Sequence, residues 1–382
     1  MNILVFSWRD PKHPLAGGAE QVTHEHMKGW IEAVHQVTLF SSRIKGNPKK
    51  EEVLDEVKII RKGIQFFGVQ LSGFFYYLKN SKIFDLVIDE FHGLPFFTPF
   101  YVRKPKLAVI QEVAGKVWLK NDLPRPLNWI VGMVGYLGEP FLFLLYKKVP
   151  FISKKQTPFM TGSESARQSL VKVGISAQKI TVIPHGIKII TPRPFPEKEK
   201  TKTIMYLGAI TIDKGIDQAL QVFSILNKKG KFNFWVAGRA GDKYINYLKR
   251  ETIKLDISGR FKFFGFVDDK KKFELLARTH ILINPSILEG WGLVNIEANS
   301  VGVPVVAYSS PGLIDSVKNG ESGILVNENS PEKLAEAIID ILGDEERYKQ
   351  LQAGALLWSK NFSWEKSKRK SLTLINKIVN RN

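Results

Sequence analysis

The chain has 382 residues, 44% of them hydrophobic and 24% charged, which is enough for two domains of ordinary size with separate cores. It contains no cysteine, and this excludes disulfides, thiolate metal sites and a cysteine nucleophile. The formal net charge of +19 favours an anionic partner: a nucleotide diphosphate, an anionic membrane surface or a phospholipid-linked acceptor.

Nucleic acid is the rival anionic partner. The lysine runs at residues 270–272 and 368–370 lie on predicted helices, and the sequence has neither zinc-finger spacing nor an RNA-binding aromatic signature. We therefore expect no nucleic-acid partner.

Short apolar runs alternate with helix-like segments in the first half of the chain, at residues 3–6, 36–40, 86–89 and 106–110. This rhythm predicts a parallel sheet wrapped by helices, an α/β fold. Met1 leads directly into the first run without the pattern of a signal peptide, so we expect a cytoplasmic protein.

Residues 130–146 form an apolar segment with a single charge. The segment is shorter than the roughly 20 residues that span a bilayer, and Glu139-Pro140 interrupts it, so we expect no transmembrane helix. We predict a buried helix pair of the N-terminal domain. The alternative is a helix at the membrane interface, flanked by Trp129, Lys147 and Lys148.

A proline-rich stretch at residues 191–196 separates the two halves of the chain. Three prolines in five residues fit neither a helix nor a central strand, so we place a linker at residues 191–200 between domains 1–190 and 201–362. Five further apolar runs predict a second parallel sheet, at residues 203–206, 232–237, 261–264, 281–284 and 304–307.

The most informative motif follows the predicted strand at residues 281–284. Glu289 and Glu297 stand eight positions apart, on either side of the turn formed by residues 290–292, Gly-Trp-Gly. Good helix formers at residues 293–300 predict a helix that starts at this turn. An apolar strand, a tight turn and a helix in this order are typical of a nucleotide-binding site.

The start of this predicted helix is suited to a pyrophosphate. Its first amides, from Gly292, Leu293 and Val294, have no intrahelical partner and carry the positive end of the helix dipole. Glu297 falls about one turn further on, where a carboxylate can accept hydrogen bonds from both hydroxyls of a ribose. Glu289 precedes the turn and is expected to point toward the sugar half of a donor. The alternative is an ordinary helix start whose acidic residues complement the dipole.

The glutamate spacing resembles the signature of the family-4 retaining glycosyltransferases of GT-B fold, a Glu, seven residues, then Glu. The resemblance covers nearly the whole chain and implies two Rossmann-like domains facing a central cleft, with residues 363–382 forming a helix that crosses back to the N-terminal domain. The matching segments are Gly17-Gly18-Ala19-Glu20, Val182-Ile183-Pro184-His185-Gly186, Tyr206-Leu207-Gly208, Lys214-Gly215, Phe264-Gly265-Phe266-Val267 and Phe362-Ser363-Trp364.

The resemblance also implies roles for particular residues. Lys214 matches the phosphate-binding lysine of the family, and an exposed lysine at a helix start is the alternative. Gly17-Gly18 would bend a loop over the donor phosphates and the acceptor, or form a plain helix start. The expected catalytic residues are Glu289 and Lys214, and the expected nucleotide-sugar site comprises Gly17, Gly18, Gly208, Lys214, Gly238, Arg239, Gly265, Phe266, Val267, Glu289, Gly290, Trp291, Gly292, Leu293, Val294 and Glu297.

Three positions depart from the family pattern. Ala209 stands where members usually have a phosphate-binding arginine, and Arg239 in the neighbouring strand-end loop is the candidate to replace it. Gln111 stands where many members have a histidine; His92 is a second strand-end histidine, more often structural. His185 replaces the commoner asparagine at the turn between the domains, and we assign it no chemistry.

These features predict a hexosyltransferase that uses a UDP- or GDP-linked sugar and a lipid-linked or cell-surface polysaccharide precursor as acceptor. The sequence has no Asp-x-Asp element, so we expect neither metal nor cofactor. The basic charge predicts peripheral contact with an anionic membrane at its inner face. The alternatives are a nucleotide-sugar epimerase of the same fold and a pseudoenzyme that binds a nucleotide sugar without turnover.

Overall fold

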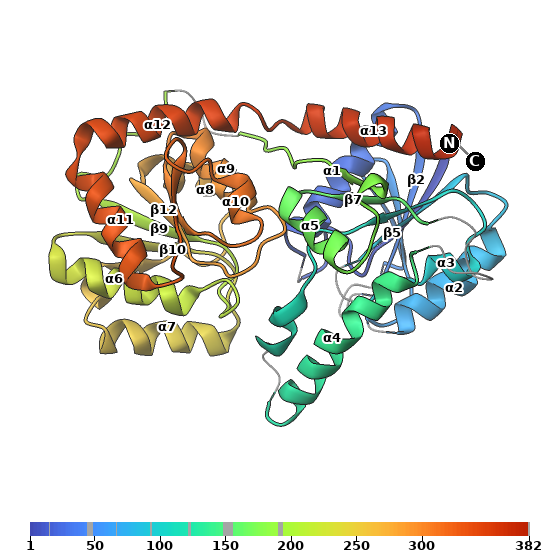
Figure 1. Ribbon diagram of the computed structural model, residues 1–382, viewed down its shortest axis with the longest axis horizontal. Coiled ribbons are helices and arrows are strands. Elements are labelled where there is room, and N and C mark those ends of the chain that lie inside the picture. Colours follow the sequence, from blue (N-terminus) through green and yellow to red (C-terminus); the bar gives the residue numbers. More distant parts are fainter. Residues whose placement is uncertain are drawn as a thin grey trace. The chain divides into compact units, whose positions relative to one another are not determined.

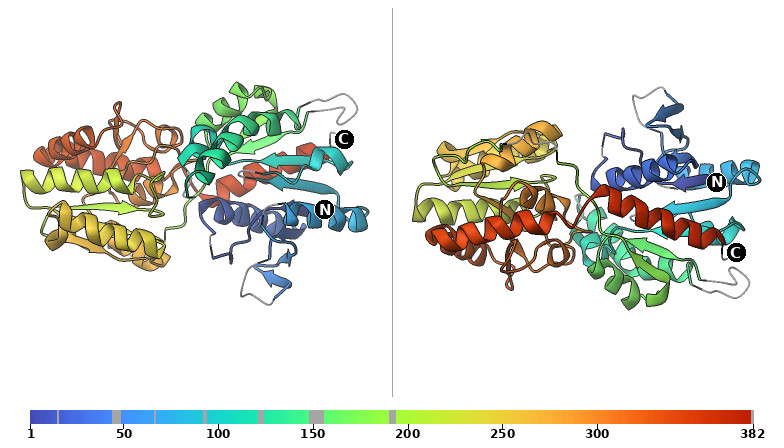
Figure 2. Two further views of the ribbon diagram at one scale, coloured as in Figure 1. Left: turned by 90° about the horizontal axis from the view of Figure 1, so that it is seen from below. Right: turned by 90° about the horizontal axis from the view of Figure 1, so that it is seen from above.

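The computed structural model describes residues 1–14, 16–43, 49–65, 67–91, 94–120, 124–147, 156–189 and 194–380. Two compact units make up the chain (Figure 1). Unit 1 combines Met1–Gly186 with Trp364–Asn382, and unit 2 is Ile187–Ser363. Each unit contains one sheet with helices on both faces, as the alternation of apolar runs and helical segments predicts (Figure 2).

The sheet of unit 1 has the strand order β3-β4-β2-β1-β5-β6-β7-β8. Neighbouring strands pair in parallel, except that β3 and β4 form an antiparallel hairpin at the edge. The strands are β1 (Asn2–Phe6), β2 (Gln36–Ser41), β3 (Glu51–Leu54), β4 (Val57–Arg61), β5 (Leu86–Glu90), β6 (Lys106–Val109), β7 (Phe159–Thr161) and β8 (Ile180–Val182).

The helices of unit 1 cover both faces of this sheet. Met27 and Trp30 of α1 and Ile375 of α13 pack on one face, and Val69 and Tyr77 of α2 pack on the other. The helices are α1 (Gly18–Glu32), α2 (Gly68–Asn80), α3 (Thr98–Tyr101), α4 (Leu127–Leu144), α5 (Glu164–Lys172) and α13 (Trp364–Asn380), with the short 3₁₀ helices η1 (Gly115–Lys120) and η2 (Ala177–Lys179).

The sheet of unit 2 is parallel throughout, with the order β11-β10-β9-β12-β13-β14. The chain runs outward from β9 to β11 and then returns to the other side of β9 at β12. Ligands of such sheets bind outside the carboxyl ends of the strands at this reversal. The strands are β9 (Thr203–Leu207), β10 (Asn233–Ala237), β11 (Phe261–Phe263), β12 (Ile281–Asn284), β13 (Val305–Tyr308) and β14 (Gly323–Val326).

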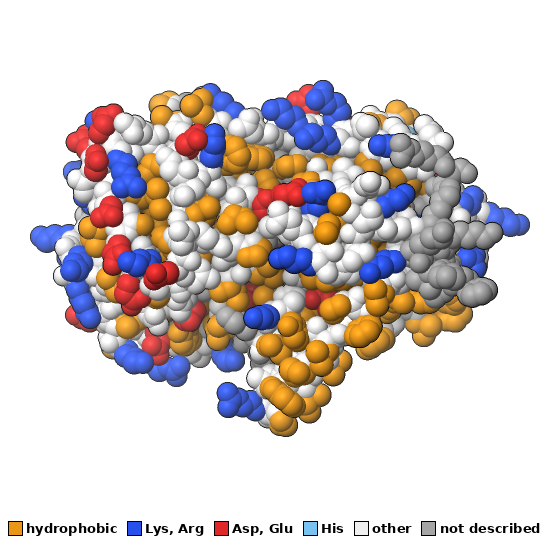
Figure 3. Space-filling model, viewed as in Figure 1, with side chains coloured by type: hydrophobic (Ala, Val, Ile, Leu, Met, Phe, Trp, Pro, Cys, Tyr) orange, Lys and Arg blue, Asp and Glu red, His pale blue; other side chains and the backbone are white. Residues whose placement is uncertain are grey.

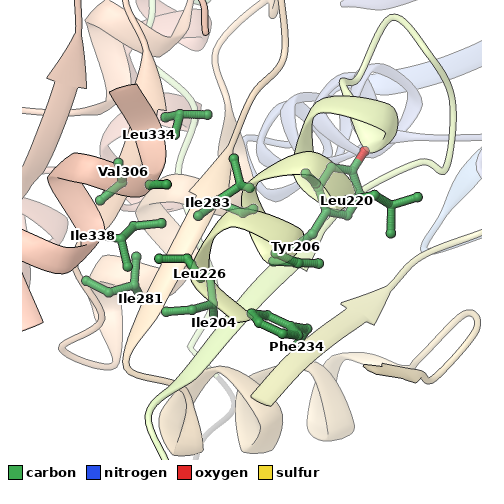
Figure 4. Close-up of a cluster of buried hydrophobic side chains, with 14 of the residues drawn as sticks. Ile204, Tyr206, Leu220, Leu226, Phe234, Ile281, Ile283, Val306, Leu334 and Ile338 are labelled. Carbon is green, nitrogen blue, oxygen red and sulfur yellow. The ribbon is translucent and has the colours of Figure 1, made fainter. Parts of the chain in front are cut away.

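The core of unit 2 follows the two-residue period of its strands. Ile204, Tyr206 and Ile283 face one side of the sheet, where they meet helices α6 and α11 (Figure 4). Met205 and Leu282 face the other side, against α8 and α9. The helices are α6 (Ile216–Lys229), α7 (Asp242–Lys254), α8 (Asp269–Arg278), α9 (Leu293–Ser300), α10 (Leu313–Ser316), α11 (Pro331–Gly343) and α12 (Glu345–Ser359), with η3 (Ser258–Arg260).

The final helix, α13, lies beside α1 within unit 1 (Figure 2). Trp30 Nε1 donates a hydrogen bond of 3.1 Å to Ser371 Oγ, and Lys368 pairs with Glu32 at 2.7 Å. Gly29 permits the close packing, because a Cβ there would lie 2.6 Å from Cβ of Lys368. Helix α13, from the C-terminal part of the chain, therefore completes the core of unit 1.

The predicted linker at residues 191–200 differs from the structure. The boundary between the units falls after Gly186, and residues 194–200 belong to unit 2. Phe195 packs against the core, Lys198 Nζ donates to the carbonyl of Thr279 at 2.5 Å, and Glu199 pairs with Arg278 at 2.5 Å. The prolines exclude helix and central strand but not packing against the surface of unit 2. Residues 191–193 lie outside the described residues.

The prediction of a buried helix pair at residues 130–146 is wrong. Helix α4 runs unbroken through Pro140, and the residues it buries are Gly132, Glu139 and Phe143. The apolar composition suggested a core, but the one charged residue faces inward and most of the large apolar residues, Phe143 excepted, face solvent. Within the described part of the chain, α4 is the helix with enough length and mean hydropathy, 1.3, to cross a membrane. Lys148, expected to flank it, lies outside the described residues.

Two buried histidines make the stability of unit 1 depend on pH. His26 lies 3.1 Å from Ser371 Oγ, and His185 stacks on Trp364. Burial lowers the pKa of His26 to about 4 and that of His185 to about 3. Histidine in the unfolded chain titrates near 6.5, so below that pH the unfolded state binds more protons, and stability decreases as the pH falls from 6.5 toward 4.

We predict that the double variant His26→Asn, His185→Asn has a flatter dependence of melting temperature on pH between about 6.5 and about 4.5 than the parent chain. Calorimetry across this range measures the two slopes. Equal slopes would show that carboxyl groups, not these histidines, control the acid sensitivity.

Candidate active site

Three glycines join the carboxyl ends of β9, β10 and β11. Gly208 donates from its amide to the carbonyl of Ala237 at 3.1 Å, and Gly238 donates to the carbonyl of Gly265 at 2.8 Å. A Cβ on Gly238 would lie only 1.7 Å from the carbonyl oxygen of Gly208, so this contact requires glycine. The structure thus brings together three residues that the sequence predicts for the donor site.

The loop after β9 is held against the end of β12. Tyr206 donates from its hydroxyl to the carbonyls of Ala209 at 2.7 Å and Lys214 at 3.2 Å. Gly215 adopts the left-handed conformation, with φ +75°, and a Cβ there would lie 2.2 Å from the carbonyl oxygen of Pro285. These contacts bring Lys214 to the strand end that carries the glutamate motif.

Lys214 and Glu289, the two predicted catalytic residues, form an ion pair. Their Nζ and Oε1 atoms lie 3.1 Å apart, and Lys214 also donates to the carbonyl of Leu288 at 3.2 Å. The amide of Glu289 donates to the carbonyl of Pro311 at 3.1 Å. Next to it, a Cβ on Gly312 would lie 2.1 Å from the carbonyl oxygen of Glu289. The backbone of residues 311–312 therefore contacts both the amide and the carbonyl of Glu289 and holds this residue in place.

Helix α9 begins at Leu293, as the motif predicts, with Gly292 as its left-handed N-cap at φ +83°. Beneath the turn, the buried Asn295 accepts from the side-chain amide of Asn284 and donates to Ser316 Oγ, both at 2.9 Å. This network anchors the helix start, so the amides of Leu293 and Val294 keep a fixed direction.

Trp291 is one of the residues predicted for the nucleotide-sugar site. Its ring is buried against Phe362 and Ile296 in a small core cluster, with ring centroids 5.2 Å apart for the Trp291–Phe362 pair. The side chain therefore supports the turn from inside unit 2, and only the backbone of Trp291 and of the adjacent Gly290 remains for the donor site.

Glu297 is paired with a lysine that the sequence reasoning did not select. Lys272, in the first turn of α8, lies 2.7 Å from Glu297 Oε1 and 2.9 Å from Asp269. Burial alone would lower the pKa of Lys272, but the two carboxylates outweigh it and raise this pKa. Glu297 is thus held by a charged lysine while its second oxygen can accept further hydrogen bonds.

Arg239 and Phe266 form a stacked pair at the ends of β10 and β11. The guanidinium carbon lies 4.6 Å from the ring centroid, and both side chains are exposed. The amide of Ile210 donates to the carbonyl of Arg239 at 2.9 Å, which places the arginine backbone beside the loop that contains Ala209. Val267 is partly buried against the core of unit 2.

The remaining predicted residues lie in unit 1. Gly17 precedes α1, and its amide donates to the Glu20 carboxylate at 2.7 Å, so this amide is already used by the helix start. Gly18 is the first residue of α1.

The two positions of unit 1 that depart from the family pattern contact each other. The side-chain oxygen of Gln111 lies 2.8 Å from His185 Nε2, and both residues are buried. His185 also needs Gly162, where a Cβ would lie 2.4 Å from Nε2. Gln111 and His185 therefore form one buried contact. His92 lies outside the described residues.

Several residues that support the site could not be predicted from the sequence. Gly312 and Lys272 come to the site from segments distant in sequence, and no local pattern in one sequence identifies such neighbours. Asn295 carries a weak local signal, a polar residue between the apolar Val294 and Ile296. Among the described residues, no group of three acidic, histidine or cysteine side chains could hold a metal ion.

Residues 188–358, nearly all of unit 2, match the family model of the glycosyl transferases group 1. Unit 2 therefore resembles this family over nearly its whole length. The site assembled above, from β9 to α9, lies entirely within the matched range.

Curated relatives of the chain include glycosyltransferases. An uncharacterised glycosyltransferase of Methanocaldococcus jannaschii is 26% identical over 48% of this chain and 50% of its own length. The D-inositol 3-phosphate glycosyltransferase of Thermobispora bispora is 24% identical over 52% of this chain and 50% of its own length. The chain thus aligns with about half the length of these relatives.

Solved structures match the whole chain and identify the fold as GT-B, with two Rossmann-like domains. Sucrose-phosphate synthase from Thermosynechococcus elongatus has a TM-score of 0.80 at 16% identity, covering 100% of both chains. The Anabaena protein HepE, solved with UDP-glucose, has a TM-score of 0.73 at 17% identity, covering 99% of this chain and 100% of its own. WaaG, a glycosyltransferase involved in lipopolysaccharide biosynthesis, has a TM-score of 0.74 at 15% identity, covering 98% of this chain and 99% of its own. The predicted fold class is confirmed, and the cleft between the domains stays a prediction.

Gly312 provides a test of the site geometry with a matched control. Gly312 and Gly320 share nearly the same φ, +79° and +78°, but a Cβ on Gly320 meets no atom within 4 Å. We predict that Gly320→Ala lowers the free energy of unfolding by about 1 kcal/mol, the cost of the left-handed conformation alone. Gly312→Ala should cost more, because the methyl group displaces Glu289. Urea denaturation measures both losses, and equal losses would contradict the tight contact.

Proposed function

We propose that the chain is a retaining glycosyltransferase that moves a hexose from a nucleotide diphosphate sugar to a hydroxyl acceptor. The observation that carries this proposal is the Lys214–Glu289 pair at the carboxyl end of β12, next to the start of α9. A nucleoside diphosphate that leaves a sugar needs a cation and helix-start amides to stabilise its growing charge. The two glutamates can then contact the sugar and the ribose, because each pairs with a different lysine.

The donor is held in this proposal by four groups of unit 2. The amides of Leu293 and Val294 bind the pyrophosphate at the positive end of α9, and Lys214 binds it from the other side. Glu297 accepts hydrogen bonds from the ribose, with Lys272 holding the carboxylate in place. The exposed Phe266 ring and its backbone receive the base. Bound UDP and UDP-glucose in HepE support a UDP-linked donor.

The chemical step is breakage of the bond between the sugar and the diphosphate. Negative charge grows on the diphosphate while the sugar becomes oxocarbenium-like. The acceptor hydroxyl attacks from the same face and passes its proton to the departing diphosphate oxygen, so the anomeric configuration is retained. Lys214 and the α9 amides stabilise the growing charge and are already oriented before the reaction. Glu289 positions the lysine and faces the sugar.

The acceptor that we propose is a lipid-linked or cell-surface polysaccharide precursor. The involvement of WaaG in lipopolysaccharide biosynthesis supports this class of acceptor. The reaction is expected to proceed without a metal ion, and turnover in the presence of a chelator tests this expectation directly.

Measurement of thermal stability with UDP, GDP, ADP and their sugars tests the donor site. A ligand that binds only the folded chain raises its melting temperature, and the rise grows with the logarithm of the ligand concentration relative to Kd. We expect stabilisation by one nucleotide and its sugar, followed by transfer to an added acceptor. Binding without turnover would indicate a pseudoenzyme, and a changed sugar without acceptor would indicate an epimerase.

We predict separate effects for the two glutamates. Glu297→Ala should weaken nucleotide affinity about tenfold or more, because it removes hydrogen bonds to a charged group that each contribute roughly 1.5–3 kcal/mol. Glu289→Ala should mainly lower turnover. Glu274→Ala is the matched control, since Glu274 also pairs with a lysine of α8 but lies outside the proposed site. Calorimetric titration with the nucleotide measures the affinity of each variant. Unchanged affinity in Glu297→Ala would falsify the assignment of Glu297 to the ribose.

A second prediction concerns the missing arginine at Ala209. A guanidinium grips phosphate oxygens in a bidentate manner, and Arg239 is bonded through its backbone to the loop that lacks one. Arg239→Ala should therefore reduce donor affinity strongly, and adding Ala209→Arg should restore part of it. Affinities of all four proteins in this double-mutant cycle provide the test. Additive effects would mean that Arg239 does not replace the family arginine.

A further inference from the structure

Helix α4 is oriented with its polar side inward. The helix carries one charged residue, Glu139, and buries it. Its outer side shows a continuous stripe of large apolar residues at spacings of three and four, together with Trp129. The exposed residues are Leu127, Trp129, Ile130, Val134, Leu137, Phe141 and Leu144. A surface helix of a soluble protein has the opposite arrangement.

Contacts with η1 and with Ala114, the residue before it, fix this orientation. The two carboxylate oxygens of Glu139 accept from the amides of Ala114 at 2.9 Å and Gly115 at 2.6 Å. Gly135 packs directly on Trp118, where a Cβ would lie 2.3 Å from the indole. Burial raises the pKa of Glu139, but the two amides offset part of this effect. Rotation of α4 to hide its apolar stripe would leave the carboxylate and both amides without these bonds.

The composition around the stripe favours lipid over a second protein helix. Residues 131, 133, 138 and 140, which flank the stripe, are valine, methionine, glycine and proline. Helix pairs in water usually carry charged residues at such flanking positions, and these set the register and face solvent. In α4 the flanks are as uncharged as the stripe itself, which suits an environment that is apolar on all sides of the exposed surface.

Charge supplies the second observation. Unit 1 contains 31 Lys and Arg against 16 Asp and Glu, a net charge of +15 out of the +19 of the chain. Residues 103–172, which surround α4 in sequence, contain 12 Lys and Arg against 4 Asp and Glu. Lys116 within η1 and Arg125, two residues before α4, are exposed. Figure 3 shows the hydrophobic side chains gathered over α4, with basic side chains beside them.

We propose that the exposed face of α4 docks unit 1 onto an anionic lipid bilayer by lying in the headgroup and acyl boundary of one leaflet. An apolar face in the boundary, with basic residues at the anionic surface, is how interfacial helices bind. The 18 residues of α4 extend about 27 Å, somewhat less than the bilayer core of about 30 Å, and Glu139 bonds the helix to the rest of unit 1. The surface does not involve the nucleotide-sugar site, so the two proposals can fail separately.

A single label tests insertion, because the chain contains no cysteine. An environment-sensitive fluorophore on Leu137→Cys reports on the α4 face, and the same label on Ile253→Cys reports on an exposed apolar position of α7 in unit 2. With vesicles of equal parts phosphatidylcholine and phosphatidylglycerol, nitroxides on the lipid acyl chains should quench the first label and not the second. Equal quenching, or none, would overturn the proposal.

Flotation of the full chain with the same vesicles measures the contribution of the apolar face. Val134→Gln with Phe141→Gln replaces side chains that are 68% and 66% exposed, so the fold is retained. This variant should lower the partition coefficient at least about tenfold, because two large apolar groups leave the lipid. The control Ile253→Gln with Leu357→Gln, at 71% and 63% exposed, should bind like the parent chain.

Two further outcomes decide between lipid and other partners. Binding should weaken at high salt and with neutral vesicles, because attraction to a charged surface decays over a Debye length of about 8 Å. A parent chain that remains in solution with anionic vesicles, and forms a dimer by light scattering that Val134→Gln with Phe141→Gln dissociates, would overturn the proposal in favour of a second copy. Nucleotide affinity should be the same in all these variants.

Discussion

The close approach of backbone to backbone at the strand ends of unit 2 is the constraint on which the candidate site depends. At Gly215, Gly238 and Gly312, a single methyl group would lie within 2.2 Å of a carbonyl oxygen in another loop. At each contact two loops approach so closely that their functional groups come together. Lys214 lies beside Glu289 because Gly215 lets its loop pack on Pro285, and Gly312 packs against the Glu289 carbonyl. The side chains that we propose for the chemistry are thus positioned by glycines.

Much of this arrangement is visible in the sequence. The order of apolar runs predicts two parallel sheets, and the glutamate spacing predicts a helix that begins at residue 293, where α9 does begin. Local patterns succeed here because a strand, a turn and a helix are each determined by a few consecutive residues. The short strands β7, β8 and β14 and the β3–β4 hairpin escape such patterns, because their pairing partners, rather than long apolar runs, stabilise them.

Errors of sequence reasoning arise where composition and orientation disagree. Residues 127–144 have the composition of a core, and the structure turns them outward because Glu139 has its partners on the inner side. Trp291 belongs to the motif predicted for the nucleotide-sugar site, and its ring is buried with Phe362, which is more than seventy residues away. A hydrophobic sequence predicts that side chains favour apolar surroundings. Which way each side chain points depends on partners that only the folded chain brings together.

The return of α13 to unit 1 has a consequence for how the chain is made. Unit 2 is one continuous segment, so it can fold as soon as Ser363 has left the ribosome. Unit 1 is synthesised first but lacks part of its core until Ile375 and Ile378 arrive. Until then Met27 and Trp30 pack on the sheet but lack the contacts that α13 supplies. The domain that begins synthesis is therefore the last to finish folding.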